Sequence, residues 1–215
     1  MIDNKQENNY KSQTAELLLK LKAIKLNPRE PFTWTSGWKS PIYCDNRILL
    51  SDPSSRNIIA NYFSEIINHK YDDVEVIAGV ATGAIGIGIL VAQILDLPFI
   101  YVRPEAKKHG RKNQIEGKIS ENQKIVVIED LISTGKSSLN AIKALRKSNL
   151  EVLGMIAIFT YGLNISVKNF KKNEVNLDTL SNYNELIKKA IDIGYISEND
   201  WETLKKWNEN PENWG

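Results

Sequence analysis

The chain contains very little cysteine and histidine. Cys44 is the only cysteine among 215 residues, and His69 and His109 are the only histidines. A single cysteine cannot form an intrachain disulfide, and this composition excludes zinc sites built from several cysteines or from clustered histidines. Because such cysteine usage is typical of a reducing compartment, we expect a cytoplasmic protein.

Long apolar runs and a strong net charge are also missing. No apolar run reaches the roughly 18 residues of a transmembrane helix, and the polar start MIDNKQENNYKSQ lacks the apolar core of a signal peptide. The 28 Lys and Arg residues nearly balance 26 Asp and Glu residues, which leaves a net charge of +2. We therefore expect neither nucleic acid nor a membrane as a partner.

The hydrophobic content of 42% and the mass of 24.4 kDa suit one α/β domain over residues 1–215. Strand-like and helix-like segments alternate in its middle, which predicts a mostly parallel sheet with a ligand crevice at the carboxyl ends of the strands. The expected strands are Val74–Ala78, Phe99–Val102, Ile125–Ile128 and Val152–Phe159, and the expected helices between them are Ala84–Leu95 and Ser137–Asn149.

The flanking segments predict a small hood and further helices. The hood, over residues of about 20–50, is rich in Pro, Gly, Trp and Tyr, which indicates short strands and turns. A core of about 70–162 follows, and then C-terminal helices of about 180–210 whose tryptophans are expected to pack inside. The expected flanking helices are Thr14–Ile24, Ser54–Asn68 after Asp52-Pro53, Asn182–Ile193, and Ser197–Trp207 with Ser197 as N-cap and Asp200 three residues later.

The most informative stretch is IVVIEDLISTGKSS, residues 125–138. An apolar strand leads into the acids Glu129 and Asp130, and a hydroxyl-rich loop with Gly135 then leads into a helix. The unpaired N–H groups and positive dipole end of a helix N-terminus bind phosphate. The two acids would repel phosphate unless they face ribose hydroxyls or a metal ion, so the stretch predicts a site for a phosphorylated sugar.

Two other interpretations of this stretch compete. Gly135-Lys136-Ser137 matches the end of a nucleotide P-loop, but Asp130 stands where the first glycine of that motif is required. The second alternative is a buried strand followed by an ordinary polar turn.

The stretch resembles the phosphoribosyl pyrophosphate (PRPP) signature of type I phosphoribosyltransferases. Two more segments narrow the resemblance to orotate phosphoribosyltransferases: FTWTSGWKSPIYCDNR, residues 32–47, and YVRPEAKKHGRKNQIEG, residues 101–117. The resemblance implies the type I fold, a mostly parallel sheet flanked by helices with an N-terminal hood. It also implies transfer of the phosphoribosyl group of PRPP to orotate, which yields orotidine 5′-phosphate and pyrophosphate for pyrimidine synthesis.

The same resemblance assigns roles to residues. It makes Lys107, His109 and Asp130 catalytic, and it gives Ser133 to orotate. The hood segment adds Lys39 as a cation for the orotate carboxylate and Tyr43 either as a stacking partner or as an ordinary core aromatic. Residues expected to bind PRPP are Arg103, Lys107, His109, Glu129, Asp130, Leu131, Ile132, Ser133, Thr134, Gly135, Lys136 and Ser137.

Three further expectations follow from the resemblance. Mg²⁺ binds mainly through PRPP and pyrophosphate, so no dedicated protein metal site is expected. The enzyme is a homodimer in which the loop 103–117 closes over the neighbouring active site. The loop 79–88 brings backbone N–H groups of Ala81, Thr82 and Gly83 to pyrophosphate, whereas Gly86 and Gly88 serve either that purpose or close helix packing.

The sequence departs from some family members at the base site. Thr35 and Pro104 stand where those members have lysines, and no arginine follows Arg146. The sequence therefore does not identify the groups that hold the orotate carboxylate. A purine phosphoribosyltransferase and a non-catalytic PRPP-sensing regulator are the alternative functions, although the hood and the K-x-H-G loop speak against the first and the lack of a DNA-binding pattern against the second.

Overall fold

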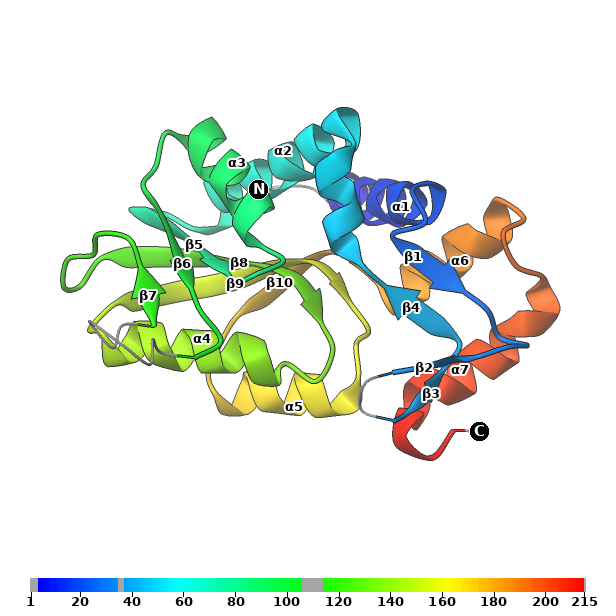
Figure 1. Ribbon diagram of the computed structural model, residues 1–215. Coiled ribbons are helices and arrows are strands. Elements are labelled where there is room, and N and C mark those ends of the chain that lie inside the picture. The colour runs from blue at the N-terminus through cyan, green and yellow to red at the C-terminus, as the bar shows by residue number, and fades with distance from the viewer. Residues whose placement is uncertain (1–3, 35–36, 106–113, 215) are drawn as a thin grey trace.

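A six-stranded sheet forms the centre of the protein (Figure 1). The computed structural model describes residues 4–34, 37–105 and 114–214. The strand order is β10-β9-β8-β5-β6-β7, and β7 alone in this sheet runs antiparallel to its neighbour. The mostly parallel sheet expected from the sequence is thus confirmed. The strands are β5 (Val76–Val80), β6 (Phe99–Val102), β7 (Ile115–Glu116), β8 (Lys124–Ile132), β9 (Glu151–Thr160) and β10 (Leu177–Asn182).

Helices cover both faces of the sheet, as Figure 1 shows. Side chains of β8 alternate between the two layers: Val126 and Ile128 belong to one core cluster and Ile125 and Val127 to the other. This double burial explains the unbroken β-branched run in the sequence. Within the described residues, none of the helices combines the length and the apolar character needed to cross a bilayer. One layer contains α1 (Asn4–Lys20), α2 (Pro53–Lys70), α3 (Ile85–Leu95) and α6 (Tyr183–Asp192), and the other contains α4 (Lys136–Lys147) and α5 (Asn164–Lys172).

The hood consists of short strands and a C-terminal helix beside the sheet. Strands β1 (Ile24–Leu26) and β4 (Ile42–Cys44) form one antiparallel pair, and β2 (Phe32–Thr33) and β3 (Lys39–Ser40) form another. These confirm the predicted short strands. Helix α7 (Trp201–Glu209) lies beside them in Figure 1. The remaining elements are the 3₁₀ turns η1 (Asn46–Ser51), η2 (Glu198–Asp200) and η3 (Pro211–Asn213).

Several helix signals are confirmed by the structure. Asp52 caps α2 by accepting a hydrogen bond from Ser55 N at 2.8 Å, and Pro53 occupies the first turn. Ser197 and Asp200 form the expected capping box, although the turn η2 separates it from α7. Trp207 is fully buried, and Trp201 and Trp214 pack against the same core, so the prediction that all three are packing residues is confirmed.

Several sequence-based boundaries are wrong. The first helix starts at Asn4 rather than Thr14, and it ends at Lys20 rather than Ile24, because Ile24 pairs with Cys44 in β1. Strand β8 continues past Ile128 to Ile132, because its extension pairs with β9. Helix α5 and strand β10 were not predicted, and β10 extends the sheet beyond the expected core limit of residue 162.

Candidate active site

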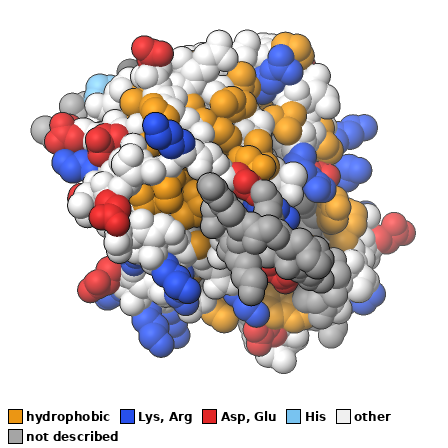
Figure 2. All heavy atoms as spheres, turned by 60° about the vertical axis from the view of Figure 1, so that its left-hand side comes forward, with side chains coloured by type: hydrophobic (Ala, Val, Ile, Leu, Met, Phe, Trp, Pro, Cys, Tyr) orange, Lys and Arg blue, Asp and Glu red, His pale blue; other side chains and the backbone are white. Residues whose placement is uncertain are grey.

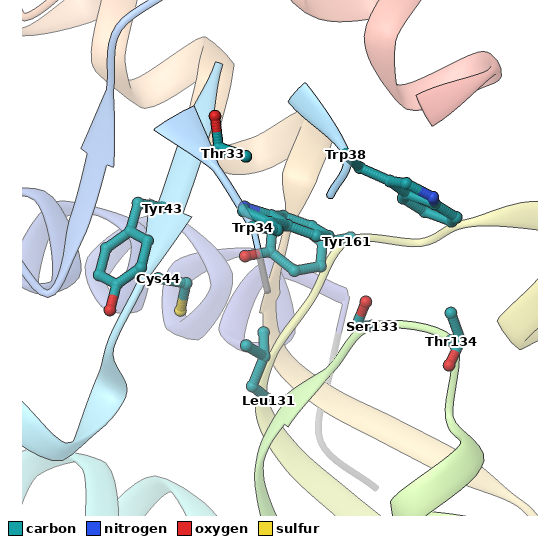
Figure 3. A pocket seen from close by; sticks show the side chains of 9 residues that line it. All are labelled: Thr33, Trp34, Trp38, Tyr43, Cys44, Leu131, Ser133, Thr134 and Tyr161. Atoms are coloured by element: carbon teal, nitrogen blue, oxygen red, sulfur yellow. The ribbon is translucent and has the colours of Figure 1, made fainter. Parts of the chain in front are cut away.

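A cavity of about 470 Å³ lies between the hood and the carboxyl ends of β8 and β9 (Figure 3). Its position matches the crevice expected from the alternating pattern of strands and helices. Aromatic rings make most of its hood side, and hydroxyl groups stand on the core side. The lining residues are Thr33, Trp34, Trp38, Tyr43, Cys44, Leu131, Ser133, Thr134 and Tyr161.

The hydroxyl loop connects β8 to helix α4 at the edge of this cavity. Ser133 and Thr134 line the cavity, and Gly135 follows with a φ of 78° just before the helix. A Cβ atom at Gly135 would lie 2.7 Å from the ring of Phe170, so both backbone angle and space call for glycine. The unpaired N–H groups of the first turn of α4 are thus presented beside two hydroxyls, which suits a phosphate.

The other predicted loop residues differ in their exposure. Leu131 lines the cavity, whereas Ile132 is fully buried in the core. Any contact of Ile132 with a ligand in the cavity would therefore involve its backbone. Lys136 and Ser137 are exposed in the first turn of α4.

The two neighbouring acids have different surroundings. Glu129 is only 4% exposed, and its carboxylate accepts hydrogen bonds from Ser138 Oγ at 2.7 Å and from Asp130 N at 3.1 Å. Burial raises the pKa of Glu129 well above its ordinary value, and the charge of Asp130 raises that pKa further. Glu129 therefore joins the strand end to helix α4. The PRPP contact predicted for it stays a prediction.

Asp130 is partly exposed, and burial also raises its pKa. Its carboxylate lies against the backbone of the loop after β5, since a Cβ atom added at Gly83 would overlap it. Its carbonyl oxygen accepts a hydrogen bond from Asn46 Nδ2 at 2.6 Å. Asp130 is thus held between the hood and the loop 79–88, where its carboxylate can meet a ligand that spans the two.

The glycines that follow in helix α3 have a packing role. A Cβ atom at Gly86 would lie 2.7 Å from Leu50, and one at Gly88 would lie 2.7 Å from the ring of Phe99. These distances favour the close-packing interpretation for both glycines. Gly83 differs, because its neighbour is the carboxylate of Asp130.

The predicted base-binding residues lie on the hood. Tyr43 is 44% exposed and lines the cavity, so it is not a core aromatic; its ring packs on Phe32 at 5.7 Å. Lys39 is exposed, and its Nζ donates to Thr33 Oγ1 at 2.9 Å. Because Thr33 lines the cavity, the ammonium group of Lys39 lies near its edge.

The predicted basic loop is described only at its ends. Arg103 follows β6, and its side chain pairs with Glu116 at 3.4 Å. This ion pair connects the two ends of the 103–117 segment. Lys107 and His109 lie outside the described residues, so their predicted roles stay predictions.

Five cavity residues were missed by the sequence-based assignment: Thr33, Trp34, Trp38, Cys44 and Tyr161. The first four lie within residues 32–47, the hood segment that resembles the family, so their position in this segment could have identified them as site residues. Tyr161 follows β9, and Trp34 packs against it with ring centroids 5.2 Å apart. Only the tertiary fold brings these two rings together.

Comparisons with known proteins agree with this arrangement. The phosphoribosyl transferase domain family matches residues 46–194. The orotate phosphoribosyltransferase of Cytophaga hutchinsonii is 53% identical over 206 residues, which cover 96% of this chain and 99% of that protein. That of Listeria monocytogenes is 53% identical over 203 residues, with coverages of 94% and 97%.

A solved structure extends the agreement to the fold. The orotate phosphoribosyltransferase of Aeropyrum pernix superposes with a TM-score of 0.73 at 27% identity, and the match covers 85% of this chain and 99% of that one. With a hydroxyl loop and an acid pair beside an aromatic cavity, and with relatives of more than half identity along almost its full length, this chain belongs to the orotate phosphoribosyltransferases.

Proposed function

We propose that the protein transfers the 5-phosphoribosyl group of PRPP to orotate, which yields orotidine 5′-phosphate and pyrophosphate. The observation that carries the proposal is that Ser133 and Thr134 belong to both the phosphate-type loop and the cavity wall. A sugar phosphate held at the N-terminus of α4 would therefore have its ribose beside a base in the cavity. The product serves pyrimidine synthesis, and a cytoplasmic location fits the single cysteine.

The transfer makes C1 of the ribose electron-poor as pyrophosphate leaves. The partly buried carboxylate of Asp130 can accept hydrogen bonds from ribose hydroxyls and favour that positive charge. The aromatic wall of the cavity reduces access of water, which would otherwise compete with the base for C1. Binding both substrates in this orientation also lowers the entropic cost of their reaction.

The leaving pyrophosphate requires neutralisation. We assign this task to the backbone of Thr82 and Gly83 together with Arg103, Lys107 and His109. The N–H group of Ala81, also predicted for this role, instead donates to the carbonyl oxygen of Val102 at 2.9 Å. Mg²⁺ fits the donor set, because the Asp130 carboxylate is a hard oxygen donor beside the loop 79–88. When bound with PRPP, the ion would stabilise negative charge on pyrophosphate.

Gly83→Ala is expected to weaken PRPP binding about tenfold with little loss of stability. The added methyl group would overlap the Asp130 carboxylate, which is the mobile end of a side chain and can rotate away. The measurement is isothermal titration calorimetry with PRPP and Mg²⁺, together with thermal unfolding. In the Asp130→Asn variant, Gly83→Ala should weaken PRPP binding much less, since both substitutions act through the Asp130 carboxylate. If the two substitutions instead weaken PRPP binding additively, the mechanism is contradicted.

For the base, we propose stacking on Tyr43, a hydrogen bond to Ser133 and attraction of the orotate carboxylate by Lys39. Lys39→Met is expected to raise the KM for orotate about two- to fivefold, because the ammonium group near Thr33 is exposed and screened. The KM for PRPP should stay unchanged, and added KCl should raise the wild-type KM for orotate. Lys22→Met, at an exposed lysine in the turn before β1, is the matched control. Equal KM values for both variants would exclude Lys39 from base binding.

We also propose that the enzyme is a homodimer in which the loop 103–117 reaches the neighbouring active site. Helix α3 exposes Ile89 by 48% and Ile94 by 47%, and Ile48 is 37% exposed in η1. Figure 2 turns the side with β6 and β7 forward and shows hydrophobic side chains gathered among charged ones. Apolar surface of this kind favours an interface. Light scattering coupled to size-exclusion chromatography measures the mass directly.

The deciding assay follows the fall in orotate absorbance when protein, PRPP, Mg²⁺ and orotate are mixed. Product chromatography identifies orotidine 5′-phosphate, and parallel reactions contain hypoxanthine or adenine. Turnover of orotate alone supports the proposal. Turnover of a purine would favour the purine alternative, and PRPP binding without turnover of any base would favour the sensor.

A further inference from the structure

Two consecutive residues of helix α7 bond to the two parts of the protein beside the cavity, the hood and the end of β9. Trp207 Nε1 donates to the carbonyl oxygen of Lys39 at 3.1 Å, on the hood side. Asn208 Nδ2 donates to the carbonyl oxygen of Tyr161 at 2.6 Å, on the core side. Neither residue lines the cavity itself. One turn of α7 thus connects the two parts of the protein between which the cavity lies.

The rings behind the cavity form a second connection. Trp34 and Tyr161 line the cavity, and Trp207 packs edge-on against both, with centroid distances of 5.6 Å and 5.7 Å. Trp207 is fully buried, whereas Trp34 is only partly buried. Edge-to-face packing of this kind restricts the orientation of each ring. Trp34 and Tyr161 also pack directly on each other at 5.2 Å, so Trp207 supports this aromatic pair from the side away from the cavity.

Helix α7 has its own anchor, which does not involve the cavity. Tyr183 of α6 donates through Oη to the carbonyl oxygen of Leu204 at 2.9 Å, and this bond is buried. Leu204 is fully buried in the same core cluster as α6 residues Leu186 and Ile187. Helix α7 is therefore anchored to the body of the protein by contacts outside the cavity. Trp207 and Asn208 connect this anchored helix to the residues beside the cavity.

We infer that Trp207 and Asn208 are positioning residues that hold the aromatic wall of the base cavity in place and thereby maintain the affinity for orotate. The inference rests on the proposed function, because it assigns the cavity to the base. The phosphate-type loop is held by β8, α4 and the bond from Asn169 Nδ2 to the carbonyl oxygen of Thr134 at 3.2 Å. Tyr161 N also donates to the carbonyl oxygen of Ile132 at 3.1 Å, and substitution of Asn208 leaves this backbone bond in place. Loss of the α7 contacts should therefore affect orotate and spare PRPP.

The test compares two asparagine substitutions of equal size. Asn208→Leu removes the donor to Tyr161 at nearly constant volume and adds no charge. Asn213→Leu is the matched control, because Asn213 is exposed and donates only locally, to Asn210 Oδ1 at 3.0 Å. Wild-type KM values for orotate and PRPP are measured first. Saturation by orotate establishes the proposed function independently of the variants.

Asn208→Leu is expected to raise the KM for orotate about three- to tenfold, the usual effect of one lost hydrogen bond, while the dissociation constant of PRPP stays within about twofold. Trp207→Phe, which keeps a ring but loses the N–H donor, should likewise raise the KM for orotate and leave PRPP binding unchanged. It replaces Asn208→Leu as the test if that variant does not fold. Wild-type KM for orotate in the folded variant would overturn the inference. Equal weakening of both substrates would overturn it too, since that result indicates a general loss of structure.

Discussion

Substitution of Asp130 by asparagine is expected to weaken PRPP binding about ten- to hundredfold. The change keeps the shape of the side chain and the bond from Asn46 to the backbone carbonyl, but it removes the charge that strengthens hydrogen bonds from ribose hydroxyls. Because that charge also favours the cationic sugar during transfer, kcat should fall as well. Titration calorimetry with PRPP and Mg²⁺ measures the affinity, and the orotate assay measures kcat.

Asp96→Asn provides the matched control for this prediction. Asp96 is exposed at the end of α3 in the left-handed conformation with a φ of 54°, which asparagine tolerates well. The Asp96→Asn variant should have the PRPP affinity and the kcat of the wild type. An unchanged PRPP affinity in Asp130→Asn would remove Asp130 from the ribose site.

Lys107→Ala is expected to reduce kcat at least about a hundredfold while PRPP still protects the protein against thermal unfolding. An ammonium group that meets the leaving pyrophosphate acts mainly on the charge that develops in the transition state, so its loss should affect turnover more than binding. Lys118→Ala is the control, since Lys118 is an exposed lysine just after the same connection.

Mixing the two impaired variants, Lys107→Ala and Asp130→Asn, tests whether Lys107 acts across subunits. In a heterodimer of Lys107→Ala and Asp130→Asn, one active site would combine an intact Asp130 with an intact Lys107 from the partner. Activity should therefore return after exchange of subunits. If each site instead used its own Lys107, the mixture would stay as inactive as its components.

The sequence predicted the phosphate-type loop well because its signal is local. Residues 125–138 carry strand, acids, hydroxyls and helix start in one continuous run, and β8, the loop and α4 follow in that order. Glycine is required at position 135 of this run, because the backbone φ is 78° and the Phe170 ring leaves no room for a Cβ atom. The strand end was misplaced because Glu129 and Asp130 are polar, although backbone pairing with β9 continues through them.

The parts that could not be predicted depend on distant contacts. Strand β10, LDTLSN, has a mixed polar pattern because it pairs on one side only, at the edge of the sheet. Likewise, no local pattern relates Trp34 to Tyr161 or either ring to Trp207. The aromatic back of the cavity arises only when the hood, the end of β9 and α7 pack together.

This composite cavity has a consequence for the order in which the site assembles during translation. A ribosome delivers the hood strands, then the hydroxyl loop at 133–135, then Tyr161, and only afterwards the turn that contains Trp207 and Asn208. The nascent chain can thus complete its sugar-phosphate half while its base half still lacks support. A truncated or stalled product that ends before residue 201 would therefore retain the elements proposed to bind the phosphate, while the proposed base site would lack its support from α7.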